Sequence, residues 1–377
     1  MPQPFHICFT FFGDMQYDSR LFKCAKTLSS GGYRVSAVTV GVRSQRSEHS
    51  GISVISIPVP PSSSKKFQFL SFYLKALRPT IQSGANCYFA SDLYSLPLAY
   101  VAARFRHARL LYDSRELYSA IAALRRRKLM QRFWSYIERR IIPSAHVVFT
   151  VNDALADIIT ERYHISKQTT LLNCPPRQEV QKSDRLRELL SIPSDKKIIL
   201  YQGGLQEGRG IFVSLSAIKK IDNAVLVFLG EGNLRDQIVR TIEQERLHGR
   251  VFLLEAAPVS ELLHYTAGAD IGLCLIENYG TSYYHSLPNK LFEYVAAGIP
   301  VVASSFPEIR RFVESNGVGI CVNPEDKEEV ESAVRRILTD PDLYKTLLSN
   351  CIETSKRYTW EKEGAKLVMK VEELKKL

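Results

Sequence analysis

Short runs of apolar residues recur along the chain, and the segments between them repeat apolar residues every three or four positions. The short runs are typical of buried strands, and the longer repeats are typical of helices that cover a sheet. Regular alternation of the two favours parallel sheets with helices on both faces. The predicted strands span residues 6–11, 34–40, 53–57, 87–90, 110–113 and 147–151 in the first half, and 197–202, 224–229, 251–254, 271–275, 299–303 and 319–322 in the second.

Proline and glycine residues divide this pattern into two halves. Gly31–Gly32 end a helix predicted over residues 19–30, and Pro143 ends another over 124–142. A Pro175–Pro176 pair followed by a polar stretch indicates a hinge. The sequence therefore predicts an α/β protein of two doubly wound domains, with ligand at the carboxyl ends of the strands. The expected boundaries are 1–175, 176–355 and a terminal helical segment, 356–377.

The composition indicates a soluble protein in a reducing compartment. A chain of 377 residues suits two domains better than one core. No apolar run reaches the roughly 18–20 residues that span a bilayer, and the N-terminal segment reads as a strand rather than a secretion signal. Seven scattered cysteines without C-x-x-C spacing predict reduced thiols, with neither disulfide nor zinc site. We therefore expect a cytoplasmic protein that does not cross a membrane.

Positive charge is concentrated in the first half of the chain. Residues 1–180 hold 24 Lys and Arg against 11 Asp and Glu, whereas residues 181–377 hold 26 against 28. Ten of the basic residues, besides Arg115, fall between positions 104 and 140. Such asymmetry predicts an anionic partner for the first half, whether a membrane, a lipid diphosphate or a nucleic acid.

The segment 286–302, SLPNKLFEYVAAGIPVV, joins a helix directly to a buried strand. Ser286 is suited to cap this helix, Pro288 to its first turn and Gly298 to its end. Three polar residues fall on the stripe opposite its apolar face: Asn289, Lys290 and Glu293. Because a helix N-terminus attracts anions, an anion, a lysine and a carboxylate can meet here. Alternatively, the lysine and the glutamate form only an exposed ion pair, which stabilises little.

Glycine turns follow two of the predicted strands in the second half. The strand over 197–202 runs into Gly203–Gly204, and Arg209 precedes the next helix. A strand, a glycine turn and a helix in this order can present backbone N–H groups to a phosphate. Gly230 follows the strand over 224–229 in the same way. Such turns are also ordinary connections in any α/β domain.

Three segments together resemble the retaining glycosyltransferases of family 4, which have the GT-B fold: residues 110–117, 197–213 and 286–302. The resemblance implies two Rossmann-like domains facing a central cleft, and a C-terminal helix that crosses back onto the first domain. From the pattern alone, a helix that packs only on its own domain is an equal alternative. The resemblance further implies metal-independent transfer of a sugar from a UDP- or GDP-sugar, without a cofactor. The second domain would hold the donor, and the basic first domain the acceptor.

The family carries two glutamates eight positions apart, and the second of them binds the ribose of the donor. Glu293 matches this second glutamate, whereas the first falls on His285. Arg209 matches a lysine that holds the diphosphate, and the family's companion arginine falls on Gly204, so Lys290 is expected to compensate. We therefore expect catalysis from Arg209, Lys290 and Glu293. The resemblance implies the remaining donor-binding residues: Gly13, Gly203, Gly204, Arg115, Gly230, Leu254, His285, Asn289 and Leu291.

Arg115 departs from the family pattern. It lies in the string D-S-R-E-L of residues 113–117, where many members carry a histidine that contacts the donor sugar. An arginine cannot act as a base at neutral pH, and it favours an anionic neighbour. The alternative is a surface ion pair of Arg115 with Glu116 or Asp113.

Residues 124–142 combine basic and aromatic side chains in the manner of an interfacial helix. The residues expected at an acceptor or an anionic membrane surface are Arg125, Arg126, Arg127, Lys128, Arg132 and Trp134. Lysines and aromatic residues at 65–73 extend this profile. The alternative places Trp134 in the core and leaves the arginines solvated. The expected location is the inner face of the cell membrane.

The resemblance implies transfer of a sugar to a glycan or lipid-linked acceptor, in the synthesis of a bacterial surface polysaccharide or glycolipid, with no nucleic acid as partner. Two alternatives stay open. A GT-B sugar-nucleotide isomerase shares the layout but needs acid and base carboxylates beside the sugar. A non-catalytic binding subunit fits the replacements at His285, Gly204 and Arg115, and its basic half could serve a nucleic acid or a membrane. The histidines show no metal-ligand spacing, so no metal is expected.

Overall fold

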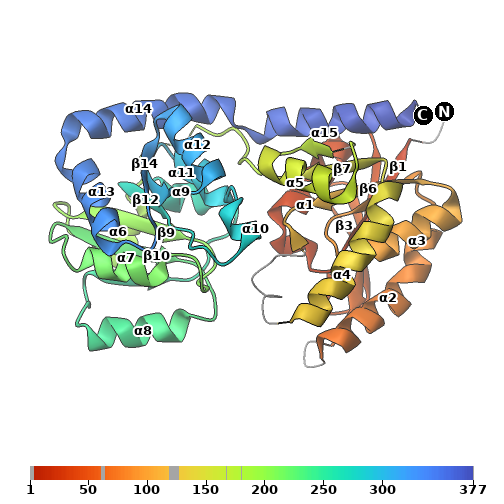
Figure 1. Ribbon diagram of the computed structural model, residues 1–377, viewed down its shortest axis with the longest axis horizontal. Helices are drawn as coiled ribbons and strands as arrows, with labels where there is room; N and C mark the ends of the chain where they lie inside the picture. The colour runs from red at the N-terminus through yellow and green to blue at the C-terminus, as the bar shows by residue number, and fades with distance from the viewer. Residues whose placement is uncertain (1–3, 61–63, 119–126, 167, 180, 377) are drawn as a thin grey trace. The chain divides into compact units, whose positions relative to one another are not determined.

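The structure is a computed structural model that describes residues 4–60, 64–118, 127–166, 168–179 and 181–376 (Figure 1). The chain forms two compact units. The first contains Met1–Asn173 together with Glu361–Leu377, and the second contains Cys174–Trp360. Each unit is built around one largely parallel sheet with its own apolar core.

The sheet of the first unit has the strand order β3-β4-β2-β1-β5-β6-β7-β8. All neighbouring strands are parallel except β3 and β4, which are antiparallel. The strand order reverses at β1, so loops diverge on either side of its carboxyl end, as at the ligand crevice of other doubly wound sheets. The strands are β1 (His6–Phe11), β2 (Arg34–Gly41), β3 (Gln45–His49), β4 (Ile52–Pro58), β5 (Cys87–Ala90), β6 (Arg109–Ser114), β7 (Val147–Thr150) and β8 (Gln168–Thr170).

Four helices of the first unit bury apolar residues in the same core against one face of this sheet (Figure 1). They are α2 (Lys65–Gln82), α3 (Leu96–Arg106), α4 (Lys128–Ile141) and α5 (Asp153–Tyr163). Helix α1 (Ser19–Ser30) follows the 3-10 turn Met15–Tyr17, and another such turn, Ile142–Ser144, follows α4. Helix α15 (Trp360–Lys375) buries Leu367, Val371 and Leu374. Its Glu363 and Glu372 accept hydrogen bonds from the Leu172 amide and the Tyr33 hydroxyl.

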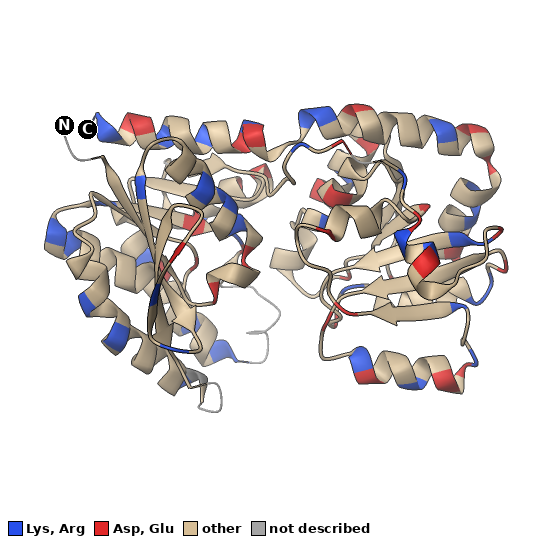
Figure 2. Cartoon of the chain, turned by 180° about the vertical axis from the view of Figure 1, so that it is seen from behind, with Lys and Arg blue, Asp and Glu red and all other residues tan. Residues whose placement is uncertain are grey.

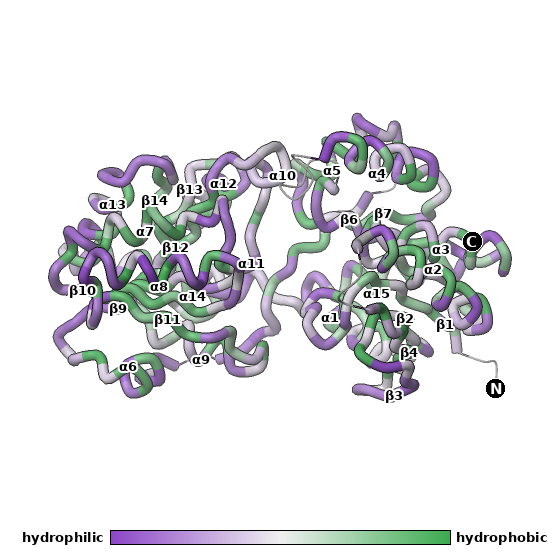
Figure 3. Tube along the Cα trace, turned by 90° about the horizontal axis from the view of Figure 1, so that it is seen from below, coloured by the Kyte–Doolittle hydropathy of each residue, from purple (hydrophilic) through white to green (hydrophobic). Residues whose placement is uncertain are grey.

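The sheet of the second unit is parallel throughout, in the order β11-β10-β9-β12-β13-β14. Its strands are β9 (Lys197–Gln202), β10 (Ala224–Leu229), β11 (Val251–Leu254), β12 (Ile271–Cys274), β13 (Val301–Ser304) and β14 (Gly319–Val322), and Figure 3 shows apolar residues along them. Its helices are α6 (Arg185–Leu190), α7 (Ile211–Ile218), α8 (Arg235–Gln244), α9 (Leu262–Thr266), α10 (Thr281–Tyr284), α11 (Asn289–Ala296), α12 (Pro307–Asn316), α13 (Lys327–Thr339) and α14 (Pro341–Arg357).

The predicted fold class, two doubly wound α/β domains, is confirmed. Two strands were not predicted, β3 and β8. All five residues of β3 are exposed, and its sequence QRSEH lacks the apolar alternation that marks a half-buried strand. The strand predicted at 299–303 begins only at Val301, because Pro300 precedes it and has no amide to donate. The first residues of the predicted helix 124–142 lie outside the described residues.

Candidate functional site

Lys290 is the second residue of α11, and its side chain is buried, with 7% exposed. Its Nζ lies 3.7 Å from the centroid of the Tyr201 ring at the end of β9. Within the part of the chain that the structure describes, this Nζ has no hydrogen-bond partner. The prediction that Lys290 lies on the stripe opposite the apolar face is therefore wrong, and so is the alternative of an exposed ion pair with Glu293. The aliphatic stem of a lysine allows such burial, which periodicity alone does not reveal.

The N-terminus of α11 is not capped by a side chain. Pro288 is its N-cap residue, and the predicted cap, Ser286, instead donates its hydroxyl to the carbonyl of Tyr283 at 2.7 Å. The first backbone N–H groups of the helix thus remain suited to an anion. At the other end Gly298 adopts a φ of +71°, as the prediction of a glycine stop requires.

Burial, and to a lesser extent the positive charge of Arg209, lowers the pKa of Lys290 from 10.5 to about 7. Cys274 and Glu293 act in the opposite direction. A buried ammonium without a hydrogen-bonded partner is costly, because burial removes its water and supplies nothing in exchange. An anion bound beside it would restore its full charge. This electrostatic situation is typical of functional sites.

The glycine turn after β9 lies directly beside this amine. A Cβ built on Gly203 would come within 3.6 Å of both Cε and Nζ of Lys290. A Cβ on Gly230, which has a φ of +156°, would lie 2.0 Å from the carbonyl oxygen of Gly203. The turns that follow β9 and β10 therefore approach each other so closely that no side chain fits at Gly230.

Arg209 lies in the loop between the same strand and α7. Gly208 and Gly210 on either side of it have positive φ values, +77° and +71°. The guanidinium lies over the ring of Tyr283 at 4.9 Å from its centroid, an arrangement that orients the cation without neutralising it. Glu277 accepts a hydrogen bond from the Gly210 amide at 3.1 Å and so helps to hold the loop.

Glu293 lies one helical turn after Lys290 and is half-buried. Its Oε2 accepts a hydrogen bond from Nε2 of Gln202, the last residue of β9, at 2.5 Å. The carbonyl of Leu254, at the end of β11, accepts a hydrogen bond from the Gly230 amide. Most predicted residues of the second unit thus lie at the carboxyl ends of β9, β10 and β11 or in α11: Gly203, Gly230, Leu254, Lys290 and Glu293. Arg209 lies in the loop between β9 and α7.

The other predicted residues of this unit differ in their burial. Gly204 is exposed, and its carbonyl accepts the hydroxyl of Tyr201 at 2.7 Å. Asn289 is exposed at the first position of α11, and Leu291 is fully buried in the core. His285 is half-buried and packs edge-on against Tyr284. The sequence did not single out Tyr201 and Tyr283, because strand and loop aromatics carry no spacing signal for contact with a cation.

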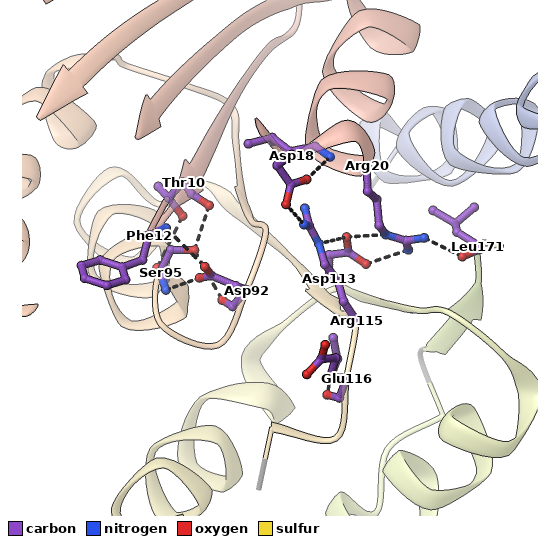
Figure 4. A network of polar contacts seen from close by, with 12 residues as sticks. Thr10, Phe12, Asp18, Arg20, Asp92, Ser95, Asp113, Arg115, Glu116 and Leu171 are labelled. Carbon is purple, nitrogen blue, oxygen red and sulfur yellow. Dashed lines mark hydrogen bonds and ion pairs between the residues drawn. The ribbon is translucent and has the colours of Figure 1, made fainter. Parts of the chain in front are cut away.

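Arg115 belongs to the first unit and is held there by two carboxylates (Figure 4). Its Nη1 donates to Asp18 at 2.5 Å, and its Nε donates to Asp113 at 3.0 Å. Asp113 also accepts two hydrogen bonds from Arg20, each 2.8 Å long. The pair of Arg115 with Asp113 was foreseen, but on the surface, and that location is wrong because Asp113 is buried.

The same network joins the start of α1 to the carboxyl end of β6. Burial alone would raise the pKa of Asp113, but the positive charges of Arg20 and Arg115 lower this pKa below its usual value. Arg20 donates further to the Leu171 carbonyl at 2.7 Å, which joins α1 and β6 to the segment after β8. Gly13 lies in the loop after β1, where its carbonyl accepts the Val40 amide at 2.9 Å. The expected roles of Gly13 and Arg115 toward a donor stay predictions.

Trp134 does not belong to a surface site. It is 3% exposed, and its ring packs against Phe69 of α2 at 5.3 Å and Tyr94 at 5.0 Å. The expectation of a membrane contact for Trp134 is therefore wrong, and the alternative that places it in the core is correct. Arg127, Lys128 and Arg132 are exposed, whereas Arg125 and Arg126 lie outside the described residues.

The described residues contain neither a metal-binding cluster nor a membrane-spanning helix. No three His, Cys, Asp or Glu side chains there gather closely enough to hold a metal ion. No described helix combines the length and the hydropathy needed to cross a bilayer. The expectation of metal-independent chemistry stays a prediction.

Comparison with solved structures identifies the architecture. Sucrose-phosphate synthase from Thermosynechococcus elongatus matches with a TM-score of 0.84 and 18% identity, over 98% of this chain and 99% of that one. HepE from Anabaena in complex with UDP-glucose matches with a TM-score of 0.75 and 14% identity, over 99% and 100%. At such low identity the likeness establishes the fold alone, and it confirms the predicted two-domain GT-B fold.

Family models place the sequence within this fold. The model described as glycosyl transferases group 1 matches residues 182–357, and the model described as a glycosyl transferase 4-like domain matches residues 20–174. The chain therefore belongs to the family 4 glycosyltransferases, as its motifs predicted.

Curated relatives match over only part of their own length. The putative colanic acid biosynthesis glycosyl transferase WcaI of Escherichia coli is 27% identical over 165 residues, which cover 42% of this chain and 39% of that protein. Chitobiosyldiphosphodolichol beta-mannosyltransferase of Candida albicans is 24% identical over 288 residues, covering 69% and 62%. The chain thus spans between about two fifths and just under two thirds of these relatives.

Proposed function

We propose that the protein transfers a sugar, with retention of anomeric configuration, from a nucleoside diphosphate donor bound by the second unit. The observation that carries this proposal is the buried Nζ of Lys290, which lies beside the Gly203 turn and the uncapped start of α11. A diphosphate supplies the anion that this amine and these amides lack. UDP-sugars and GDP-sugars are both candidate donors. The complex of the structural neighbour HepE with UDP-glucose favours a UDP-sugar as donor.

The proposed chemistry depends on stabilising the leaving group. As the bond between the sugar C1 and the diphosphate oxygen breaks, negative charge grows on the diphosphate, where Lys290 and Arg209 meet it. Glu293 binds the ribose hydroxyls. The acceptor hydroxyl attacks C1 on the face that the diphosphate leaves, and its proton passes to the departing diphosphate oxygen. No carboxylate base and no metal are required in this scheme.

A panel of nucleotides and their sugars tests the proposal. We expect UDP or GDP to raise the melting temperature, slow hydrolysis of one nucleotide sugar, and transfer that keeps the anomeric configuration, as measured by NMR of the product. Absence of a thermal shift with every nucleotide would instead favour the non-catalytic binding subunit. Epimerised sugar without transfer would favour the isomerase.

Affinity for the donor is expected to fall as the pH rises above 7. The free amine of Lys290 has a pKa of about 7, and a bound diphosphate raises this pKa. Binding therefore takes up a proton above pH 7, and affinity decreases by up to about tenfold per pH unit until the pKa of the complex is reached. Calorimetry with a UDP-sugar in buffers of different ionisation enthalpy measures this uptake. The Lys290→Met variant should show a flat profile, and an equally flat wild-type profile would contradict the assignment.

We further propose that the acceptor is glycan or lipid-linked and that the first unit rests on an anionic membrane surface inside the cell. Helices α2 and α4 cover one face of the sheet, and Phe69 packs against Trp134 between them. Their outer sides expose large apolar residues: Phe67, Leu70, Leu74 and Leu77 on α2, and Leu129, Phe133 and Tyr136 on α4. The names of two relatives support a glycan or lipid-linked acceptor: WcaI is named for colanic acid biosynthesis, and LpsE of Rhizobium meliloti for lipopolysaccharide core biosynthesis.

The charges on these helices match an anionic surface. Helix α2 contains no Asp or Glu, and neither does α3 between α2 and α4. The acidic residue of α4, Glu138, is buried and accepts the hydroxyls of Tyr112 and Tyr163. Every charged side chain that the described parts of these helices expose is therefore positive, as the basic positions in Figure 2 illustrate. Apolar residues among cations favour a lipid surface over a nucleic acid, whose backbone offers them no partner.

The double variant Leu70→Glu and Leu74→Glu should lose vesicle binding. We expect flotation with phosphatidylglycerol vesicles at about 0.15 M salt to recover the wild type, and at least about tenfold less of the variant. Val239→Glu, at an exposed apolar position of α8 in the second unit, is the matched control and should bind as the wild type does. No binding of the wild type to these vesicles, or an equal loss in the control, would refute the membrane surface.

A further inference from the structure

A buried chain of hydrogen bonds leads from α9 through β9 to Glu293. The Thr266 Oγ1 on α9 lies 2.8 Å from the Oε1 of Gln202, and the Nε2 of Gln202 lies 2.5 Å from the Oε2 of Glu293. Thr266 is fully buried and Gln202 is 1% exposed, so water does not substitute for these bonds. We propose that Thr266 and Gln202 are positioning residues that orient the Glu293 carboxylate toward the ribose. This inference rests on the proposed function.

The direction of each bond follows from the chemistry of the groups. An ionised carboxylate only accepts hydrogen bonds, so Gln202 presents its NH₂ group to Glu293 and its oxygen to Thr266. The Thr266 hydroxyl has one proton, and the carbonyl of Leu262 also lies 2.8 Å from its oxygen. Donation to only one of these carbonyl oxygens would leave the other facing the hydroxyl oxygen at 2.8 Å, so the two share the proton. The chain thus has a single direction, from hydroxyl through amide to carboxylate.

The backbone of Gln202 is fixed as firmly as its side chain. Its amide donates to the hydroxyl of Tyr294 on α11 at 3.0 Å, and Tyr294 is fully buried. The same hydroxyl lies 3.2 Å from the Leu200 carbonyl and 3.1 Å from the Leu273 carbonyl. Glu293 and Tyr294 are consecutive in α11, so β9 holds this helix through both a side-chain and a main-chain bond. The carboxylate is thereby oriented before any ligand binds.

Such orientation affects one part of the ligand only. A carboxylate that rotates freely must lose that freedom when it binds the ribose, whereas a fixed carboxylate has already lost it. Loss of the chain should therefore weaken recognition of the ribose hydroxyls and leave recognition of the diphosphate and base unchanged. A merely structural role for Thr266 would weaken both alike.

The ratio of affinities for UDP and 2′,3′-dideoxy-UDP separates these roles. We expect the wild type to prefer UDP and Thr266→Val, which keeps the shape but removes the hydroxyl, to lower this preference by about tenfold. Thr266→Ser, which restores the hydroxyl, should restore the ratio. Melting temperatures confirm that the variants are folded.

Each outcome bears on one proposal. A Thr266→Val variant that is folded and keeps the wild-type ratio would overturn the positioning role but leave the donor site intact. Equal affinity of the wild type for the two nucleotides would overturn the ribose contact of Glu293, and with it this inference. Failure of every nucleotide to bind the wild type would instead overturn the proposed function itself.

Discussion

Lys290→Met should reduce turnover by about two to three orders of magnitude, which is the effect of removing one preorganised group that stabilises transition-state charge. Affinity for the nucleotide should fall as well, by about tenfold or more, because a charge-assisted bond to the diphosphate is lost. Methionine keeps the length and much of the volume of the buried side chain. Single-turnover rates and nucleotide titrations measure the two effects separately.

The same substitution should make the protein more stable. The pKa of Lys290 is about 7 in the folded protein against 10.5 in an unfolded chain, so unfolding takes up a proton between these values. The resulting destabilisation of the folded protein is largest below pH 7, and it disappears as the pH approaches 10.5, the pKa of this lysine in the unfolded chain. Lys290→Met should therefore raise the melting temperature by several degrees at about pH 7, and by less at about pH 9.

Lys345→Met is the matched control, since this lysine is exposed on α14. It should change neither turnover nor melting temperature. A Lys290→Met variant with wild-type turnover and nucleotide affinity would remove Lys290 from the donor site. Lost activity together with a lower melting temperature would point to a packing defect instead.

Gly230→Ala should abolish nucleotide binding and destabilise the protein by about 3 kcal/mol or more. The new methyl group would lie 2.0 Å from the carbonyl oxygen of Gly203, so the turns after β9 and β10 must separate. That movement displaces the Gly203 turn from Lys290. Thermal unfolding with and without UDP measures both losses.

Gly249→Ala isolates the effect of this close approach. Gly249 also has a positive φ, +75°, but a Cβ there would meet nothing within 4 Å. Its substitution should cost only the backbone strain, about 1–2 kcal/mol, and leave nucleotide binding unchanged. Equal effects of the two substitutions would show that strain, rather than contact between the turns, governs Gly230.

The sequence predicted the fold well because most strands are short, apolar and bounded by turns. β1, β5, β9, β10, β11 and β14 were predicted with their observed limits. Prediction failed where an element carried no such pattern, as in the fully exposed β3 and in β8, whose three residues, QTT, are half-buried. Both strands are added at the edges of the sheet, where pairing depends on the neighbouring strand more than on local apolar residues.

The site was predicted in part. Motif spacing indicated which residues of α11 and of the glycine turns belong together, because strand ends and helix starts converge in a doubly wound sheet. It did not indicate that Lys290 is buried, that Trp134 belongs to the core or that Ser286 does not cap the helix. Those outcomes depend on side-chain direction and on neighbours distant in sequence, such as Tyr201 and Phe69, which a helical repeat does not encode.

The division of the chain has a consequence for its synthesis. The second unit is continuous in sequence, whereas the first also needs Glu361–Leu377, which are translated after the whole of the second unit. Until those residues emerge, the surface that covers Leu367, Val371 and Leu374 stays open in the nascent protein. The unit translated first is therefore completed last, and chaperones have the whole elongation time to act on its uncovered apolar surface.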